Sequence, residues 1–257
     1  MESAGATLLY QQSVRLRKLR YIPYIGDGDS KAYTAICEAQ PYGLAVFIPK
    51  EECIAHVTKR MGTGLRKLLA DYKGKMLSGG KGLGGTRRLT HNRMDTIQNV
   101  YGRAIRDNKG NAKEMAKATH AILKHYSSTL EEPKHNDCPS GPTSWCSFQR
   151  DRANGTNCHK PIKNPLPDAV VEVLQPLFNR LGDETFLVGC ENCYTQNRNE
   201  CLHHVIWGMA AKEMFSSPRE ISLAISTRAS APPTQIFSLL LALRYNQKCL
   251  KLGKILI

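Results

Sequence analysis

The stretch YIGDGDSKAY (residues 24–33) places two aspartates two positions apart, directly after a short run of residues that favour β-structure. Aromatic and β-branched residues gather in residues 21–26, which predicts a strand there. Asp29 or Ser30 can cap a helix that we expect to continue to about Ala39. The stretch therefore predicts the start of an α/β fold, with acidic side chains where a strand gives way to a helix.

The two aspartates, Asp27 and Asp29, allow two interpretations. A carboxylate at the end of a strand is held by the sheet and still projects from it, and divalent cations favour oxygen ligands in such fixed positions. Asp and Gly are also ordinary residues of turns and helix caps. The stretch alone leaves a metal site and a simple turn as alternatives.

The elements predicted next continue the α/β pattern. Residues 43–49 (GLAVFIP) have the composition of a second short strand. Residues 50–72 are typical of a helix, in which residues 62–64 allow a break. Strand, helix, strand and helix in this order suggest half of an α/β sheet.

The middle of the chain is predicted to be helical. Two apolar helix faces follow from the spacing, one made of Met94, Ile97, Tyr101, Ala104 and Ile105, the other of Met115, Thr119, Ile122 and Tyr126. A loop rich in Pro, Cys and Gly follows in residues 131–167. We therefore divide the chain into an α/β part (1–75), a helical insertion with a Cys/His-rich loop (76–190) and C-terminal helices (191–257).

Positive charge is concentrated in the first half of the chain. The sequence has 36 Lys and Arg residues against 22 Asp and Glu residues, a net charge of +14. Residues 1–130 hold 22 of the basic and 10 of the acidic residues. DNA is a natural partner for such a surface, because each phosphate that is neutralised releases counterions. A basic surface that is merely solvated is the alternative.

The sequence shows no membrane or secretion signal that we recognise. Residues 1–12 lack the basic segment and apolar core of a signal peptide. The longest apolar run, residues 236–243, is too short to span a bilayer. We therefore expect no membrane partner and a reducing compartment, where cysteines clustered with histidines favour metal binding over disulfides.

Cysteine and histidine side chains supply candidate ligands for structural zinc. Cys53 and His56 are three positions apart on a predicted helix, so both can reach one ion. Zinc accepts thiolate and imidazole together and usually binds four ligands. Partners for this pair are available at His135, Cys138, Cys146, Cys158, His159, Cys190 and Cys193. As candidate ligands we take Cys53, His56, Cys138 and Cys146. Buried cysteines without a metal are the alternative.

The stretch TQNRNECLHHVIW (residues 195–207) carries a further candidate ligand. Glu200 lies in a predicted helix, with Asn197 three positions before it and His203 and His204 after it. A helical carboxylate beside amides and imidazoles can complete a metal site that begins elsewhere. Taken alone, Glu200 is equally typical of a solvated helix surface.

These parts, in this order, resemble the Mutator-like transposase domain, a ribonuclease-H-like nuclease of the DDE group. The resemblance spans about residues 19–215. It rests on the strings LRYIPYIGDGDSKAY, ECIAHVTKRMGTGLRKL, GGTRRLTHNRMDTIQNVYGRAIRDN, CPSGPTSWC and TQNRNECLHHVIW. No single string is specific, but together they are.

The resemblance implies a catalytic triad of two aspartates and a glutamate that holds two Mg²⁺ ions. The second aspartate of the triad falls on Asp27, with Asp29 as the close alternative, and the glutamate falls on Glu200. The Cys-x-x-His pair of the family falls on Cys53 and His56. The implied fold is α/β, a partial ribonuclease-H-like core with a large all-helical insertion.

The sequence departs from this pattern at its start. The first aspartate of the family lies on the first strand of the sheet, and strands one to three find no counterpart in these residues. Two-metal phosphoryl transfer needs a carboxylate that bridges both ions, so we expect little or no catalysis from this chain.

The resemblance also implies partners and a location. Transposon ends and target DNA are the expected partners, the nucleus is the expected location, and formation of a homo-oligomer is left open. Two alternatives to a transposase fragment remain: a DNA-binding remnant without chemistry, and a zinc-stabilised protein that contacts other proteins.

Overall fold

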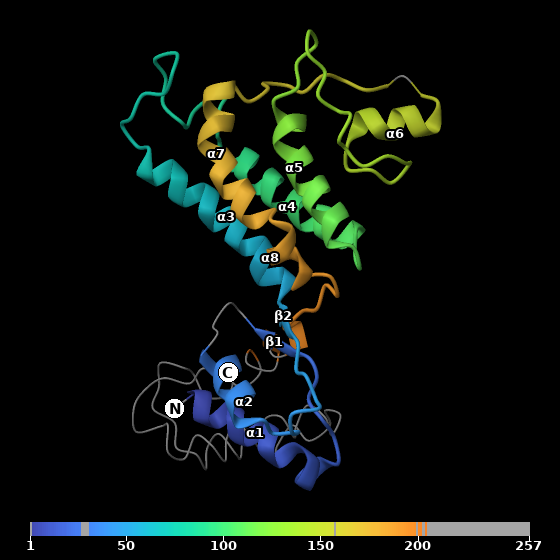
Figure 1. Cartoon of the computed structure of the whole chain (residues 1–257). Helices are drawn as coiled ribbons and strands as arrows, with labels where there is room; N and C mark the ends of the chain where they lie inside the picture. The colour runs from blue at the N-terminus through green and yellow to red at the C-terminus, as the bar shows by residue number, and fades with distance from the viewer. Residues whose placement is uncertain (1, 27–30, 157, 199, 202–203, 205–257) are drawn as a thin grey trace. The chain divides into compact units, whose positions relative to one another are not determined.

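Helices predominate in the structure, a computed structural model that describes residues 2–26, 31–156, 158–198, 200–201 and 204 (Figure 1). The elements, in chain order, are α1 (Glu2–Arg17), β1 (Tyr24–Gly26), α2 (Lys31–Ala39), β2 (Lys50–Glu52), α3 (Ile54–Asp71), α4 (His91–Asp107), α5 (Ala112–Tyr126), α6 (Ser147–Asn154), α7 (Asp168–Leu181) and α8 (Glu184–Val188). The chain divides into two compact units, one of Met1–Lys50 with Thr195–Ile257, the other of Glu51–Tyr194.

The first unit packs α1 against α2 around a small aromatic core. Tyr10, Ile36 and Ile48 are buried there. The rings of Tyr10 and Tyr21 meet edge to face with their centroids 5.7 Å apart, a favourable arrangement for aromatic side chains. The hydroxyl of Tyr42 accepts a hydrogen bond of 2.7 Å from the backbone N–H of Tyr21. These contacts hold the segment that leads into β1.

The predicted strand and helix around the two aspartates are confirmed as β1 and α2. The second strand is not where the sequence predicted it: residues 44–45 form a turn, residues 46–49 have no regular structure, and β2 begins at Lys50. Ile48 of this stretch is buried, but Leu44 and Phe47 are 87% and 76% exposed, so the stretch does not present the continuous apolar face of a buried strand. The backbone N–H of Gly43 instead donates to the carbonyl of Gln40 over 2.9 Å.

β1 and β2 pair as a two-stranded sheet. The order strand, helix, strand, helix that the sequence predicted is present as β1, α2, β2 and α3. A larger ribonuclease-H-like sheet remains a prediction, as does the division of the chain at residues 75 and 190.

The second unit is a bundle in which α3, α4, α5, α7 and α8 enclose one apolar core (Figure 1). Both predicted faces, on α4 and α5, are confirmed, because every residue named for them is buried. The hydroxyl of Tyr101 on α4 donates a buried hydrogen bond of 2.8 Å to the carbonyl of Leu181 at the end of α7. Apolar periodicity therefore placed the core of this unit correctly.

The glycines of α3 serve helix packing. The break that residues 62–64 allowed does not occur, since α3 runs without interruption from Ile54 to Asp71. A Cβ atom on Gly64 would lie 2.6 Å from Cδ1 of Leu177 on α7, closer than carbon atoms approach. Glycine thus lets α3 and α7 come close together.

Among the described helices, none combines the length and the apolar composition that a membrane span requires.

Candidate metal centre

Four buried side chains of the second unit direct their ligand atoms to one place. We call them the His/Cys cluster: His125, His135, Cys138 and Cys146. Their ligand atoms all lie within 4.8 Å of one another. They are the one such group of three or more potential ligands in the part of the chain that the structure describes.

The cluster joins three pieces of the chain. His125 lies in the last turn of α5. His135 and Cys138 lie in the loop that follows α5, and Cys146 is the N-cap residue of α6. A ligand shared by all four side chains would therefore hold the loop to both helices.

The distances within the cluster match those around a tetrahedral zinc ion. Zinc bonds of about 2.0–2.1 Å to nitrogen and about 2.3 Å to sulfur separate two nitrogens by roughly 3.3 Å and a nitrogen from a sulfur by roughly 3.6 Å. The Nδ1 atoms of His125 and His135 are 3.2 Å apart. Cys138 Sγ lies 3.6 Å from Nδ1 of His125, and Cys146 Sγ lies 3.7 Å from Nδ1 of His135. The cluster could hold a metal such as zinc.

Hydrogen bonds fix the orientation of the His135 ring. Its Nε2 lies 3.1 Å from the hydroxyl of Ser128, which also accepts a hydrogen bond from the backbone N–H of Lys134. The side-chain amide of Gln149 on α6 donates to the carbonyl of His135 over 2.8 Å. Metal-bound histidines commonly form a hydrogen bond through the ring nitrogen that does not bind the metal, as Nε2 of His135 does here with Ser128. Nδ1 of His135 is thereby turned toward the two cysteines.

The electrostatics of the cluster suit a metal that binds thiolate and neutral imidazole. A hydrogen bond from the Cys138 thiol lowers the pKa of Cys146, and the neighbouring His125 lowers it further. The same hydrogen bond, together with burial, raises the pKa of Cys138. Burial lowers the pKa of His135, which keeps its imidazole neutral. The opposite shifts of the two thiol pKa values make Cys146 the more acidic of the pair.

Aromatic side chains surround the cluster. The ring of Trp145 meets His125 edge to face at 5.0 Å between centroids. The ring of Phe148 stacks on His135 at 4.9 Å and an interplanar angle of 18°. His159 packs against the same two rings, and Nδ1 of His159 lies 2.9 Å from the hydroxyl of Ser147. An apolar shell of this kind keeps water away from a metal.

Of the four zinc ligands that we took from the sequence, the cluster contains Cys138 and Cys146. Cys53 is buried as the N-cap residue of α3 and His56 lies in the first turn of that helix. The structure does not place either in the cluster. Their role as the family's Cys-x-x-His pair remains a prediction.

His135 was among the partners that the sequence predicted for the zinc ligands, whereas His125 was not predicted. His125 lies in a helix whose apolar spacing already explained the burial of its neighbours, so nothing in that pattern drew attention to it. The spacing that reveals it is His-x9-His-x2-Cys-x7-Cys, which ends at Cys146.

The other candidate cysteines of this unit are packed in its apolar core. Cys190 is fully buried among core residues, and burial raises its pKa to about 12. Burial also raises the pKa of Cys193. These two thiols remain protonated and act as small apolar groups.

Of the carboxylate candidates, Glu200 is the one that the structure describes, and it lies in the first unit. Asp27 and Asp29 fall outside the described residues. Glu200 is exposed, and its backbone N–H donates a helical hydrogen bond of 3.0 Å to the carbonyl of Gln196. The side-chain amide of Gln196 in turn donates to the carbonyl of Ile25, in β1, over 2.9 Å. The turn that carries Glu200 is therefore joined to the strand that ends just before Asp27.

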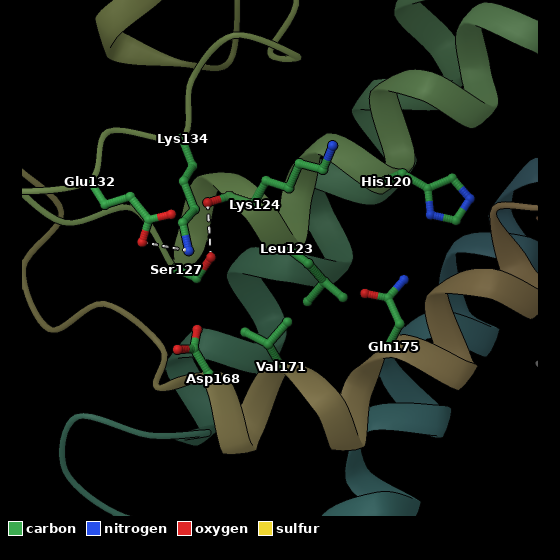
Figure 2. Close-up of a pocket in the computed structure, with 9 residues that line it drawn as sticks. All are labelled: His120, Leu123, Lys124, Ser127, Glu132, Lys134, Asp168, Val171 and Gln175. Carbon is green, nitrogen blue, oxygen red and sulfur yellow. Dashed lines mark hydrogen bonds and ion pairs between the residues drawn. The ribbon is translucent and has the colours of Figure 1, made fainter.

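A cavity of about 570 Å³ between α5 and α7 is lined by none of the predicted site residues (Figure 2). Its charges are mixed: Lys124 and Lys134 face it together with Glu132 and Asp168. Nζ of Lys134 pairs with Glu132 at 3.2 Å. Because these charges largely offset one another, the cavity offers neither a strong anion site nor a strong cation site.

Comparison with known proteins identifies the class of this chain. The family model of the Mutator-like transposase matches residues 1–146, which include the whole His/Cys cluster. This match covers more than half of the 257 residues, so the chain belongs to the Mutator-like transposase family. No curated protein and no solved structure matches it.

Proposed function

We propose that the first unit is part of a DDE-type active site, in which Asp27, with Asp29 as the alternative, and Glu200 bind Mg²⁺ beside DNA. In the family this site cuts and joins transposon DNA. The surrounding fold is a ribonuclease-H-like sheet that carries the helical part of the chain as an insertion.

The contact between Gln196 and Ile25 is the observation that carries this proposal. Ile25 lies two residues before Asp27, and Gln196 lies one helical turn before Glu200. Carboxylates that share a divalent ion must come from chain segments that lie side by side. This hydrogen bond between segments distant in sequence supports the convergence of the two carboxylates.

The excess of basic residues supports DNA as the partner. The net charge of +14 arises almost entirely from residues 1–130. Asp27 and Glu200 are the two carboxylates that we assign to the triad, so we propose DNA binding and weak divalent-ion binding, with little cleavage, for this chain by itself. Transposon ends and target DNA are the ligands that the family implies.

Metal binding by the carboxylates is tested with Mn²⁺, which replaces Mg²⁺ and is read by electron paramagnetic resonance. Glu200→Gln and Asp27→Asn are each expected to weaken Mn²⁺ binding at least 10-fold, because each removes a charged oxygen ligand. Glu38→Gln, on the exposed face of α2 in the same unit, is the matched control. Equal Mn²⁺ binding by all three variants and the unaltered chain would refute the site. Weaker Mn²⁺ binding in Asp29→Asn but not in Asp27→Asn would show that Asp29 is the ligand.

DNA binding without any chemistry is the second candidate, favoured by the charge distribution. Fluorescence anisotropy with a labelled duplex tests it. With about six phosphate contacts, affinity falls roughly 10³-fold between about 50 and about 200 mM salt. Steep salt dependence that Glu200→Gln leaves unchanged, without Mn²⁺ binding, would favour this candidate over the active-site proposal.

A nuclear location follows from the need of a transposase to reach chromosomal DNA. The basic run RLRKLR (residues 15–20) is the candidate signal. A fluorescent fusion is expected to concentrate in the nucleus and to lose that concentration when the four basic residues of the run are replaced by glutamine.

A further inference from the structure

The loop between α5 and α7, residues 127–165, is long and has little regular structure. Among its described residues, α6 is the one regular element. Loop 127–165 contributes little to the apolar core of the unit, against which its Trp145 is partly buried. Connections longer than about 12–15 residues without structure of their own are uncommon in compact domains. Something other than apolar burial must hold loop 127–165 in place.

Hydrogen bonds hold loop 127–165 near its two ends. The backbone N–H of Leu166 donates to the carbonyl of Tyr126 over 2.7 Å, which closes the loop at its base. On α4, Arg93 donates to the carbonyls of Lys163 and Asn164, each over 3.1 Å. These bonds leave the middle of the loop to be explained.

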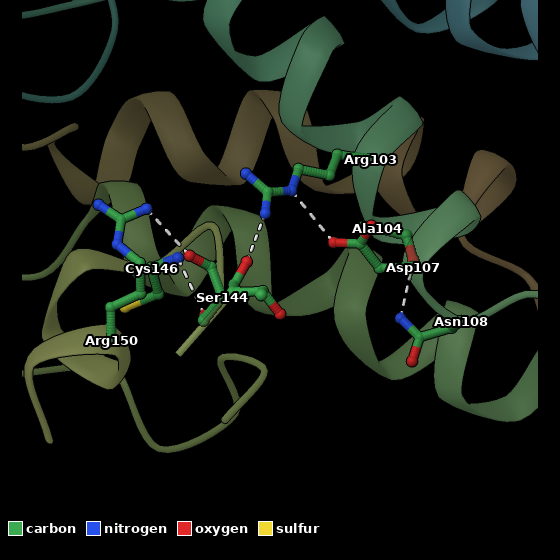
Figure 3. Close-up of polar contacts among 8 residues, drawn as sticks. Arg103, Ala104, Asp107, Asn108, Ser144, Cys146 and Arg150 are labelled. Carbon is green, nitrogen blue, oxygen red and sulfur yellow. Dashed lines mark hydrogen bonds and ion pairs between the residues drawn. The ribbon is translucent and has the colours of Figure 1, made fainter. Parts of the chain in front are cut away.

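The turn before Cys146 is held by two arginines (Figure 3). Arg103 on α4 donates to the carbonyl of Thr143 and pairs with Asp107 at 3.1 Å. Arg150 on α6 donates to the carbonyl of Ser144 over 3.0 Å. The turn thus presents Cys146 to the interior, where the other three members of the cluster lie.

We propose that the His/Cys cluster binds one Zn²⁺ through Nδ1 of both histidines and Sγ of both cysteines. The bound ion holds loop 127–165 against α5. Four protein ligands complete the tetrahedral coordination of zinc and leave no position for water or substrate. The ion is therefore structural. This proposal is independent of the DDE site, because its residues all belong to the second unit.

The donor set favours zinc over the metals of the proposed DDE site. Thiolate and imidazole are soft and borderline ligands, whereas Mg²⁺ and Mn²⁺ favour oxygen. The tetrahedral arrangement of two sulfurs and two nitrogens is typical of zinc.

Zinc content tests the ligand set. The purified chain, kept in reductant, is expected to contain about one zinc per molecule. Cys138→Ser is expected to lower that content at least 10-fold, while Cys138→His, which supplies another ligand, retains part of it. Cys158→Ser is the matched control, because Cys158 is exposed in the same loop. Unchanged zinc content in Cys138→Ser, or equal loss in Cys158→Ser, would overturn the proposal.

Co²⁺ titration of the unaltered, chelated chain keeps the test valid if a variant fails to fold. Co²⁺ in a tetrahedral site with two thiolates gives strong absorption from sulfur to metal and intense d–d bands, and Zn²⁺ is expected to displace it. Octahedral spectra without sulfur absorption would contradict the proposed ligands.

Limited proteolysis tests the structural role. After chelation, cleavage within residues 128–165 is expected to become at least 10-fold faster, and added Zn²⁺ is expected to restore resistance. Equal cleavage rates with and without zinc would show that the ion does not hold the loop.

Discussion

The helical bundle and loop 127–165 belong to the same unit but are stabilised by different kinds of interaction. The bundle buries apolar side chains from every helix that forms it, and its stability follows from the area removed from water. The loop buries mainly polar groups, which need partners of their own. The same unit therefore combines a region whose order we assign to a bound ion with a region whose order follows from apolar burial.

Truncation in the bundle core should have the largest effect. Phe178 on α7 is completely buried, and Phe178→Ala should lower the free energy of unfolding by about 3–5 kcal/mol. Denaturant unfolding at saturating zinc measures it. Met76→Ala, which removes a side chain that is 73% exposed, should change the free energy of unfolding by less than about 0.5 kcal/mol. Similar effects of the two variants would mean that apolar burial does not stabilise the bundle.

Loss of a contact behind the cluster should affect zinc more than the bundle. Ser128→Ala removes the partner of His135 Nε2, and zinc affinity should fall about 10–100-fold. Competition with a chromogenic chelator measures the affinity. Ser147→Ala, whose hydroxyl contacts His159 outside the cluster, is the control. An equal decrease in both variants would mean that the orientation of His135 is not what matters.

Loss of a helix cap should have an effect of intermediate size. The side chain of Asn111 accepts a hydrogen bond of 3.1 Å from the backbone N–H of Glu114 at the start of α5. Asn111→Ala should lower the free energy of unfolding by about 1 kcal/mol. Asn111→Asp keeps the hydrogen-bond acceptor and should change the free energy of unfolding by no more than about 0.3 kcal/mol. Thermal unfolding measures both, and zinc affinity should not change in either.

A surface ion pair should have the smallest effect. Arg66 on α3 and Asp95 on α4 pair at 2.7 Å, with side chains 48% and 58% exposed. Asp95→Asn should lower stability by at most about 0.5 kcal/mol, and salt should remove the difference. A larger effect that persists at high salt would show that α3 and α4 depend on this pair more than on their apolar contact.

The sequence predicted those features that follow from local periodicity. Helical spacing identified the buried faces that include Tyr101 on α4 and Ile122 on α5, because a helix face needs no knowledge of distant segments. Composition alone misplaced the second strand at residues 43–49, since Leu44 and Phe47 are apolar but exposed. Whether apolar residues are buried depends on partners that a short stretch does not show.

The candidate sites were partly predictable for the same reason. Cysteine spacing identified Cys138 and Cys146, but their grouping with His125 depends on how the loop folds back onto α5. The predicted pairing of Asp27 with Glu200 depends on contacts between distant segments. The hydrogen bond between Gln196 and Ile25 supports that pairing, which the sequence reached only through the family resemblance.

Hydrogen–deuterium exchange of the chain with and without a zinc chelator distinguishes a loop held by zinc from a bundle held by apolar burial. We predict that chelation speeds exchange throughout loop 127–165 and in the last turn of α5, while backbone amides in the middle of α4 and α7 keep their protection. Unchanged exchange in the loop would mean that zinc does not hold it, and equal loss of protection in α4 and α7 would mean that the bundle also depends on zinc.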